Sequence, residues 1–328
     1  MSDPLDFLQG VIAPMLTPIH ADHTLDLEGA EAFVEWLISR GCVRTVFARS
    51  GMGKMYTFTV EETKALGTAV VRAARGRIGV LLGASGEWRT RDRDRTQKPD
   101  SERYLAQAVE LTQFAQQIGA DGAVHVLPEA YVPTAGEPIS EATFRYLKTV
   151  HDAADIPIVL YQPGGLAPEY RMTPELLRRL LELPRIAGMK VSTSEDAVFG
   201  PLAEVVRGTG FALIAGNETY YLRALEQGAV GVIGEGCNVY PEILDALRSR
   251  FRAGDYAGAI RAQEDVCRAL AIKEGLDGAV IWKQILIRHG VHILPYDRNG
   301  VPPYPEETVR QVDAAYSDIR QPHIDIQH

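Results

Sequence analysis

Short apolar segments alternate with longer amphipathic segments along most of the chain. Eight apolar segments have the length and composition of strands: 10–18, 44–50, 77–84, 122–127, 156–162, 186–192, 211–217 and 230–236. The segments between them repeat apolar residues at helical spacing, and several begin with Ser or Thr and end at Gly. This alternation predicts an α/β fold, a (β/α)8 TIM barrel. A doubly wound sheet is less favoured, because no GxGxxG loop follows the first strand.

The pattern changes after the eighth unit. Residues 255–291 and 305–319 have the periodicity of further amphipathic helices. We therefore expect a barrel over residues 1–254, followed by a C-terminal helical appendage with a tail over residues 255–328. The last residues, 320–328, have little apolar surface to bury, so we expect this tail to be mobile.

A polar, strongly charged insertion at 86–103 follows the third predicted strand. Two interpretations remain open for it. It is either a solvated loop or a basic lid over the barrel mouth, since the loops that follow barrel strands build the active-site face.

The composition is that of a soluble globular protein, with 46% hydrophobic and 23% charged residues. The formal net charge of −9 argues against a general nucleic-acid-binding surface. Cys42, Cys237 and Cys267 lie far apart without CxxC or metal-ligand spacing, so we expect neither a disulfide framework nor a zinc site. The chain starts without a secretion signal pattern and has no run of 18 apolar residues, which predicts a cytoplasmic protein without membrane contact.

Side chains at the carboxyl ends of barrel strands meet at one opening. Lys190 lies near the end of the sixth predicted strand and Tyr161 near the end of the fifth. Burial favours an uncharged amine, which attacks a ketone to give a carbinolamine, and a phenol can then assist dehydration by moving protons. The alternatives are a lysine that extends into solvent and a structural tyrosine. Glu235, after the eighth strand, is either a further acid or base or a solvent-facing carboxylate.

Six motifs, in order along nearly the whole chain, resemble those of the dihydrodipicolinate synthase and N-acetylneuraminate lyase superfamily. They are PMLTP near the start, SGMGKMYTFTVEE after the second strand, VLYQP at the fifth, IAGMKVS at the sixth, AGNE at the seventh and GAVGVIGEGCNVYPEI at the eighth. Members of this superfamily are class I aldolases, which form Schiff bases. The resemblance implies a (β/α)8 lyase for pyruvate or a 2-oxo sugar acid, with no metal and no organic cofactor. It also implies a homotetramer, a dimer of dimers.

The resemblance further implies a role for particular residues. Lys190 would form an imine with the keto group of a 2-oxo acid, and Tyr161 would relay protons. The implied substrate-binding residues are Ser50, Gly51, Met52, Tyr131 and Ile233. By the same resemblance, Tyr131 lies near a subunit contact.

The turn after the second strand departs from the family pattern. The family has Gly-Thr-Thr-Gly-Glu or Gly-Ser-Thr-Gly-Glu, whereas residues 50–54 here are Ser-Gly-Met-Gly-Lys. A relay hydroxyl is therefore lost at Gly51, unless Ser50 replaces it from one residue earlier. The backbone N–H groups of such a turn still bind an anion.

The synthase's arginine after the fifth strand is also missing. Residues 164–167 are Gly-Gly-Leu-Ala, and the next arginine is Arg171. Because an arginine holds the carboxylate of the synthase's second substrate, we predict that this protein is not an efficient dihydrodipicolinate synthase. The prediction would fail if Arg171, Arg49 or an arginine of the insertion supplied the missing cation.

Two other functions remain as alternatives. A phosphate-binding isomerase barrel needs Gly-rich turns after the seventh and eighth strands, and GEGCN supplies one of them. A sensor with the same fold would bind a keto acid without turning it over.

Overall fold

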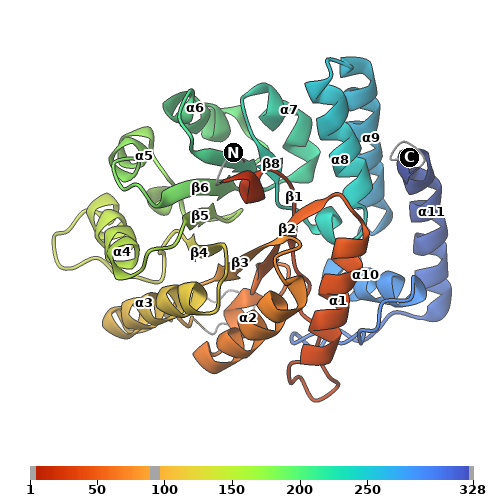
Figure 1. Ribbon diagram of the computed structural model, residues 1–328, viewed down its shortest axis with the longest axis horizontal. Coiled ribbons are helices and arrows are strands. Elements are labelled where there is room, and N and C mark those ends of the chain that lie inside the picture. Colours follow the sequence, from red (N-terminus) through yellow and green to blue (C-terminus); the bar gives the residue numbers. More distant parts are fainter. Residues whose placement is uncertain (1–4, 89–96, 325–328) are drawn as a thin grey trace.

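The computed structural model describes residues 5–88 and 97–324, and these form a closed barrel (Figure 1). Its eight strands are parallel and adjacent in chain order, and β8 pairs with β1. The strands are β1 (Gly10–Pro14), β2 (Val43–Ala48), β3 (Gly79–Gly83), β4 (Gly122–Val126), β5 (Ile158–Gln162), β6 (Ile186–Val191), β7 (Ala212–Ala215) and β8 (Gly231–Val232). The predicted (β/α)8 TIM barrel is confirmed.

Helices surround the strands in a ring, and three further helices follow the eighth unit. The helices of the ring are α1 (Leu27–Ser39), α2 (Val60–Ala74), α3 (Ser101–Gln117), α4 (Ile139–Ala153), α5 (Pro174–Leu180), α6 (Asp196–Val206), α7 (Tyr221–Glu226) and α8 (Pro241–Arg252). The C-terminal helices are α9 (Tyr256–Ile272), α10 (Gly278–Arg288) and α11 (Glu306–Ile324). Figure 1 shows α9 and α11 beside α8, on one flank of the barrel.

Side-chain caps fix the starts of several helices. At α2, the Thr59 hydroxyl accepts from the Glu62 N–H (3.1 Å) and the Glu62 carboxylate accepts from the Thr59 N–H (3.0 Å), which is a capping box. Asp26, Asp100 and Asp277 cap α1, α3 and α10 with single bonds from the helix backbone. The caps at Asp26, Thr59 and Asp100 thus mark where the loops that follow β1, β2 and β3 end.

The first and eighth strands are shorter than the sequence pattern predicts. Pro14 and Pro18 have no N–H to donate to a neighbouring strand, and β1 ends at Pro14. After β8 the chain turns at Gly234, where a Cβ would lie 2.4 Å from a Glu218 carboxylate oxygen. It continues as the short helix η6 (Glu235–Asn238), so the apolar pattern of 230–236 covers a strand and a turn.

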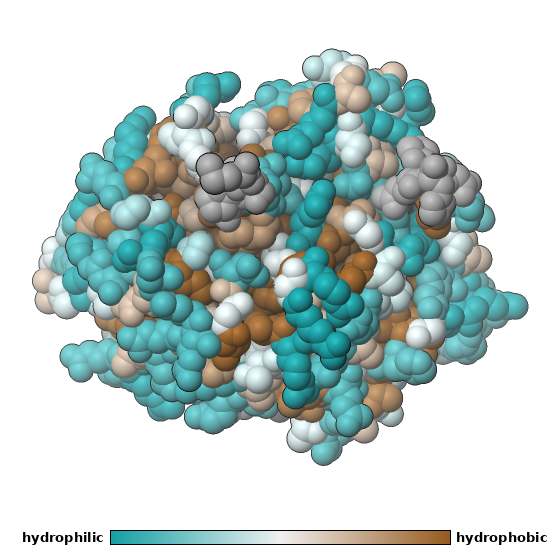
Figure 2. Space-filling model, in the orientation of Figure 1, coloured by the Kyte–Doolittle hydropathy of each residue, from teal (hydrophilic) through white to brown (hydrophobic). Residues whose placement is uncertain are grey.

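Apolar side chains fill the inside of the barrel. The short helix η1 (Asp6–Leu8) lies at the amino ends of the strands, since Phe7 approaches Gly79 of β3 and Gly122 of β4. Leu8 belongs to the interior cluster, which reaches Tyr161 and Ile233 towards the other end. In Figure 2, polar residues dominate the periphery of the face shown, and apolar patches lie between them near its centre. Because η1 covers the amino ends of the strands, the carboxyl ends form the open end that can hold a site.

The C-terminal region packs on the barrel through α11. Tyr316 is fully buried, and its hydroxyl donates to the Val239 carbonyl. The expectation of a mobile tail is wrong for residues 320–324, which continue α11. Arg320 forms an ion pair with the buried Glu242 (2.8 Å), and the buried His323 lies 2.9 Å from an Asp265 carboxylate oxygen. Charged partners on α8 and α9 thus hold the end of the helix.

The charged insertion is described only at its two ends. The Glu87 carboxylate accepts from the Val60 N–H (2.6 Å) at the start of α2, and the Trp88 indole N–H donates to the Gln97 carbonyl (2.9 Å). Lys98 donates to the Tyr170 hydroxyl (2.9 Å). Residues 89–96, on which the choice between a solvated loop and a lid depends, lie outside the described residues.

Within residues 5–88 and 97–324, no helix has the length and apolar character needed to cross a membrane. Over the same residues, no group of three or more His, Cys, Asp or Glu side chains is placed to hold a metal ion. Cys42 and Cys237 are buried thiols, and Cys267 is an exposed one.

Candidate active site

Lys190 and Tyr161 lie side by side near the carboxyl ends of two adjacent strands. They are partners in the register of β6 and β5. The Lys190 Nζ lies 4.4 Å from the centroid of the Tyr161 ring, so the amine faces the ring. Lys190 is 6% exposed and Tyr161 is 8% exposed. The structure therefore brings the predicted amine and phenol together at a buried position.

The polar atoms of this pair lack protein partners. Within the described part of the chain, neither the Lys190 Nζ nor the Tyr161 hydroxyl makes a hydrogen bond or an ion pair with another side chain or backbone group. The interior cluster around Tyr161 contains Met55, Ile214 and Ile233. The side chains packed around the phenol are therefore apolar, and the two polar atoms remain available to a ligand at the barrel mouth.

The strand-two turn, residues 50–54, is fixed by its own contacts. The Ser50 hydroxyl donates to the Met15 carbonyl (3.1 Å) and accepts from the Gly53 N–H (3.0 Å). Gly53 has no room for a side chain, because a Cβ would lie 2.6 Å from the Thr17 hydroxyl oxygen. The Ser50 hydroxyl is thus used to shape the turn. This finding argues against the expectation that it replaces the lost relay hydroxyl.

Gly51 and Met52 lie at the opening beside Tyr161. A Cβ at Gly51 would lie 3.4 Å from the Tyr161 hydroxyl oxygen, so the turn directly approaches the phenol. Gly51 and Met52 also line a cavity of about 480 Å³. Their N–H groups donate to no other backbone or side-chain group of the described residues. Two adjacent N–H groups of this kind suit an anion such as a carboxylate.

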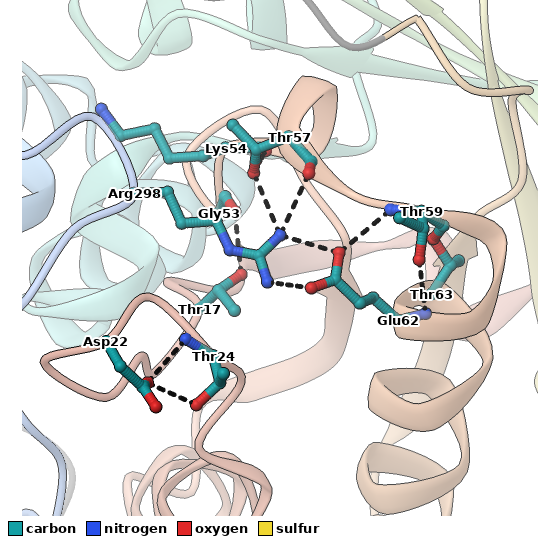
Figure 3. Close-up of polar contacts among 10 residues, drawn as sticks. All are labelled: Thr17, Asp22, Thr24, Gly53, Lys54, Thr57, Thr59, Glu62, Thr63 and Arg298. Atoms are coloured by element: carbon teal, nitrogen blue, oxygen red, sulfur yellow. Dashed lines mark hydrogen bonds and ion pairs between the residues drawn. The ribbon is translucent and has the colours of Figure 1, made fainter.

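The C-terminal region holds the strand-two turn from outside the barrel. The Lys54 Nζ lies 3.3 Å from an Asp277 carboxylate oxygen, at the start of α10. Figure 3 shows the Arg298 guanidinium between Thr57, of the short helix η2 (Met55–Thr57), and Glu62 of α2. It donates to the Thr57 carbonyl (3.1 Å) and to the Glu62 carboxylate (2.9 Å). The position of the turn therefore depends on residues more than 200 positions away in the sequence.

The structure does not bring Tyr131 to this group. Its ring packs on Tyr146 of α4, with the ring centroids 5.6 Å apart. The Arg145 guanidinium lies 5.0 Å from the centroid of the Tyr131 ring. Its hydroxyl contacts Arg145 as well, and the side chain is 5% exposed. These contacts of Tyr131 all lie within its own chain. Its expected roles in substrate binding and near a subunit contact remain predictions.

Glu218, which starts the short helix η5 (Glu218–Tyr220) after β7, is a site residue that the sequence reasoning missed. It is 3% exposed, and its carboxylate accepts from the Gly236 N–H (2.6 Å) and the Tyr240 hydroxyl (3.0 Å). Burial, reinforced by the nearby Glu235 carboxylate, raises the pKa of Glu218 to about 8. This carboxyl group fixes the turn after β8, which carries Ile233. The motif AGNE contained the residue, but only its burial reveals the role.

Glu235 itself is only partly exposed and pairs with a lysine other than Lys190. It forms an ion pair with Lys273, the residue after α9 (3.1 Å), and 17% of its side chain is exposed. It lines the same 480 Å³ cavity as Gly51. Its interpretation as a simple solvent-facing carboxylate is therefore wrong in this structure, while a role as acid or base remains a prediction.

The two arginines considered as replacement cations are bonded to backbone carbonyls. Arg49 is 2% exposed and donates to the Gly83, Ser85 and Gly86 carbonyls at 3.1, 2.5 and 3.2 Å. Arg171 donates to the Leu166 carbonyl at 3.3 Å. The Arg49 guanidinium thus braces the loop after β3, whereas Arg171 is bonded only through its Nε among the described residues. This supports the view that Arg49 does not replace the missing arginine.

Comparison with known proteins agrees with the geometry. The family model described as the dihydrodipicolinate synthetase family matches residues 7–96 and 102–318. A 4-hydroxy-tetrahydrodipicolinate synthase of Ruegeria pomeroyi is 33% identical over 280 residues, which cover 83% of this chain and 86% of that protein. A 4-hydroxy-tetrahydrodipicolinate synthase of Streptomyces coelicolor is 31% identical over 315 residues, which cover 94% and 93%.

A solved structure has the same fold at lower identity. The N-acetylneuraminate lyase of Mycoplasma synoviae superposes with a TM-score of 0.80 at 19% identity, covering 96% of this chain and 98% of that one. The match of the family model extends over most of the chain, and it includes both the lysine strand and the tyrosine strand. The chain therefore belongs to the dihydrodipicolinate synthetase family, whose members are Schiff-base-forming lyases, and it is a lyase of that family.

Proposed function

We propose that the protein acts on pyruvate or a 2-oxo sugar acid through an imine on Lys190. The observation that carries the proposal is the buried Lys190 amine, 4.4 Å from the Tyr161 ring, with no other protein partner among the described residues. A nucleophilic amine needs to be free of a carboxylate that would hold it as an ammonium ion. Its neighbour should move protons without competing as a nucleophile, and a phenol meets that need.

The reaction begins when the uncharged Lys190 amine attacks the keto carbon. The carbinolamine that forms loses its hydroxyl group as water, and Tyr161 relays the protons that this step requires. The substrate carboxylate is held by the N–H groups of Gly51 and Met52, next to the Tyr161 hydroxyl. Ile233 packs on the apolar side of the reacting group. The resulting protonated imine accepts an electron pair, so a carbon–carbon or carbon–oxygen bond near it can be cleaved or formed without a cofactor.

Within this chemistry, we propose that the protein is not an efficient dihydrodipicolinate synthase, although the relatives named above are called synthases. The loop of residues 163–167 supplies no cation, and Arg49 and Arg171 are both engaged by carbonyl groups. A charge-assisted hydrogen bond to a carboxylate stabilises by about 1.5–3 kcal/mol. Losing such bonds as well as the relay hydroxyl lowers the rate by roughly three orders of magnitude.

The decisive experiment for the imine is trapping with borohydride. Pyruvate and borohydride should add the mass of a reduced pyruvyl group, and peptide mapping should place it on Lys190. The Lys190→Met variant, which keeps a long side chain without an amine, is the control and should give no adduct. An adduct on another lysine, or none with any 2-oxo acid, would overturn the proposal.

A second assay separates the reaction types. In a coupled assay with pyruvate and aspartate semialdehyde, we expect a trapped imine but little condensation. Turnover in the usual enzymatic range of about 1–10³ per second would contradict the prediction on the synthase reaction. A sensor would instead show ligand-dependent thermal stabilisation without turnover of any sugar acid. A phosphate-binding isomerase would be stabilised by phosphate and not by pyruvate.

We also propose a cytoplasmic homotetramer, built as a dimer of dimers, that binds neither nucleic acid nor membranes. Closed symmetric oligomers are the usual form of homo-oligomeric enzymes. Light scattering at micromolar concentration tests the assembly, and a monomer would contradict it.

A further inference from the structure

Residues in a left-handed backbone conformation stand at both ends of the strand-two turn. Arg49, just before the turn, has a φ of 53°, and Lys54, its last residue, has a φ of 61°. Glycine adopts this conformation readily, whereas residues with a Cβ rarely do. Such residues persist there when their surroundings hold them, often at functional sites. Each of these two side chains should therefore have a task that glycine could not perform.

Both side chains are anchored, and they are anchored in different parts of the molecule. The Arg49 guanidinium donates to backbone carbonyls of residues 83–86, at the end of β3 and just after it. The Lys54 ammonium lies 3.3 Å from an Asp277 carboxylate oxygen and 3.9 Å from an Asp297 carboxylate oxygen. In Figure 3 the Lys54 side chain extends away from the Arg298 guanidinium. The turn is thus held by the barrel at one end and by the C-terminal region at the other.

The two aspartates that pair with Lys54 are themselves fixed. Asp277 caps α10, where its carboxylate accepts from the Val280 N–H (3.1 Å). Asp297 is 3% exposed, and its carboxylate accepts from the Asn299 N–H (3.1 Å). Lysine has a long and flexible side chain, so a fixed partner is needed to give its ammonium group a defined position.

Lys54 also closes the turn through its backbone. Its N–H donates to the Gly51 carbonyl (3.1 Å), and the N–H of Met55 donates to the Ser50 carbonyl (3.0 Å). These bonds enclose Gly51 and Met52, whose N–H groups donate to no other group in the described part of the chain. The backbone geometry at Lys54 therefore helps to set how these two N–H groups are arranged.

We propose that Lys54 is a positioning residue for the substrate carboxylate, and that the C-terminal region keeps it in place. The ammonium does not touch the substrate. Its ion pairs with Asp277 and Asp297 hold the left-handed backbone that presents the N–H groups of Gly51 and Met52. This inference rests on the proposed function and adds the residue that keeps its carboxylate site in shape. The family pattern has a glutamate at this position, which the two aspartates would repel, so the arrangement depends on the lysine of this chain.

The test compares pyruvate with methyl pyruvate, an ester of the same carbon skeleton that lacks the carboxylate charge. Borohydride trapping over a range of ketone concentrations gives the concentration at which half of the maximal adduct forms on Lys190. Lys54→Asn removes the ammonium, and asparagine tolerates the left-handed conformation. We expect this variant to raise the half-maximal concentration of pyruvate roughly fivefold, the scale of one ion pair. The value for methyl pyruvate should not change.

Arg75→Asn is the matched control for the backbone at Lys54. Arg75 is an exposed residue with a φ of 48° that follows α2. The substitution places asparagine in the same left-handed conformation without changing a contact of the strand-two turn. Both half-maximal concentrations should remain those of the wild type.

Asp277→Asn separates positioning from direct binding. Asparagine still caps α10, but Lys54 is left with Asp297 as its acidic partner. If Lys54 positions the turn, the half-maximal concentration of pyruvate should rise, as it does in Lys54→Asn. If the ammonium itself bound the carboxylate, its release from Asp277 would lower that concentration, and the inference would be wrong. Asp255→Asn, which changes the N-cap of α9, is the control and should have no effect.

Failure of this inference can be distinguished from failure of the proposed function. If pyruvate gives no adduct on Lys190 of the wild-type protein, the proposed function fails, and this inference fails with it. If pyruvate is trapped but Lys54→Asn leaves its half-maximal concentration unchanged, or shifts pyruvate and methyl pyruvate equally, only the inference fails. Should Lys54→Asn not fold, Asp277→Asn decides by the same comparison of the two ketones.

Discussion

The β5–β6 pair and the strand-two turn lie next to each other at the barrel mouth, but they are built in opposite ways. Tyr161 and Lys190 stand on strands whose backbone ladder fixes them, and their polar atoms have no protein partner in the described residues. The turn lacks a ladder, and its side chains are engaged instead: Ser50 bonds within the turn, and Lys54 pairs with Asp277.

The difference shows that the β5–β6 pair supplies the reactive groups, whereas the strand-two turn positions the ligand. The barrel's hydrogen bonds hold the reactive groups in place, so their side-chain atoms remain available for chemistry. The polar side chains of the turn, Ser50 and Lys54, make the contacts that hold its shape. Only its backbone N–H groups therefore remain for a ligand. Substitutions in the pair should therefore change rate with little change in stability, whereas substitutions in the turn should change stability and substrate binding.

The largest effect is expected for Lys190→Met. Turnover and the borohydride adduct should both be lost, with a rate decrease on the order of 10⁴-fold or more, because no other group supplies the nucleophile. The Tm should stay close to that of the wild type, since methionine fills a similar volume in an apolar surrounding. Steady-state kinetics and calorimetry check the two parts. A large drop in Tm would show that Lys190 also supports the fold.

Tyr161→Phe should have the next largest effect. Imine formation and turnover should slow by on the order of 10²-fold, the contribution of one general acid–base group. No protein hydrogen bond of the hydroxyl is lost within the described residues, so stability should not fall. Stopped-flow measurement of imine formation tests the rate. An unchanged rate would assign Tyr161 a purely structural role.

Gly53→Ala, in contrast to Lys190→Met and Tyr161→Phe, should lower the stability of the fold and weaken substrate binding. A Cβ would lie 2.6 Å from the Thr17 hydroxyl oxygen and 2.7 Å from the Met15 carbonyl oxygen, so the turn must shift. Strain of this kind costs about 1–3 kcal/mol. We expect a lower Tm, and a KM for pyruvate that rises more than kcat falls. Gly210→Ala is the control, since nothing lies within 4 Å of its Cβ position.

The smallest effect is a pH dependence from Glu218. Its pKa of about 8 lies above the unfolded value near 4.5, so the folded protein keeps a proton that the unfolded chain has released. This stabilisation is complete below about pH 4.5 and is lost as the pH rises to about 8. Glu218→Gln keeps a neutral side chain, so its Tm should improve relative to wild type between pH 6 and pH 9. A constant difference in Tm would contradict the raised pKa.

Most of the fold followed from the sequence pattern. The period of the apolar residues, together with caps such as Thr59, indicates strands and helices through local physics alone. The sequence pattern gave wrong element boundaries where contacts between residues far apart in the sequence set the structure. It extended the eighth strand through Gly234, although the buried Glu218 forces a turn there, and it treated residues 320–324 as a tail, although Glu242 and Asp265 hold them.

The candidate site was only partly predictable. Lys190 and Tyr161 follow from strand ends and motifs, because adjacent parallel strands place their carboxyl ends together. Tyr131 was expected there on resemblance alone; in the structure it packs against Tyr146 and Arg145, and its role in binding remains a prediction. Glu218 was missed, since one acidic residue after a strand carries no signal in a sequence until its surroundings are known.

The sequence by itself determined which elements form and which strand ends carry an amine and a phenol, because hydrophobic periodicity and helix capping act over a few neighbouring residues. Only the tertiary structure decided how those groups are used. It closed the barrel so that Tyr161 and Lys190 pair in register, and it brought Asp277 and Arg298 from the C-terminal region to the strand-two turn. Burial and charge pairing depend on residues that meet only after folding, so the availability of the site's polar atoms is a property of the whole chain.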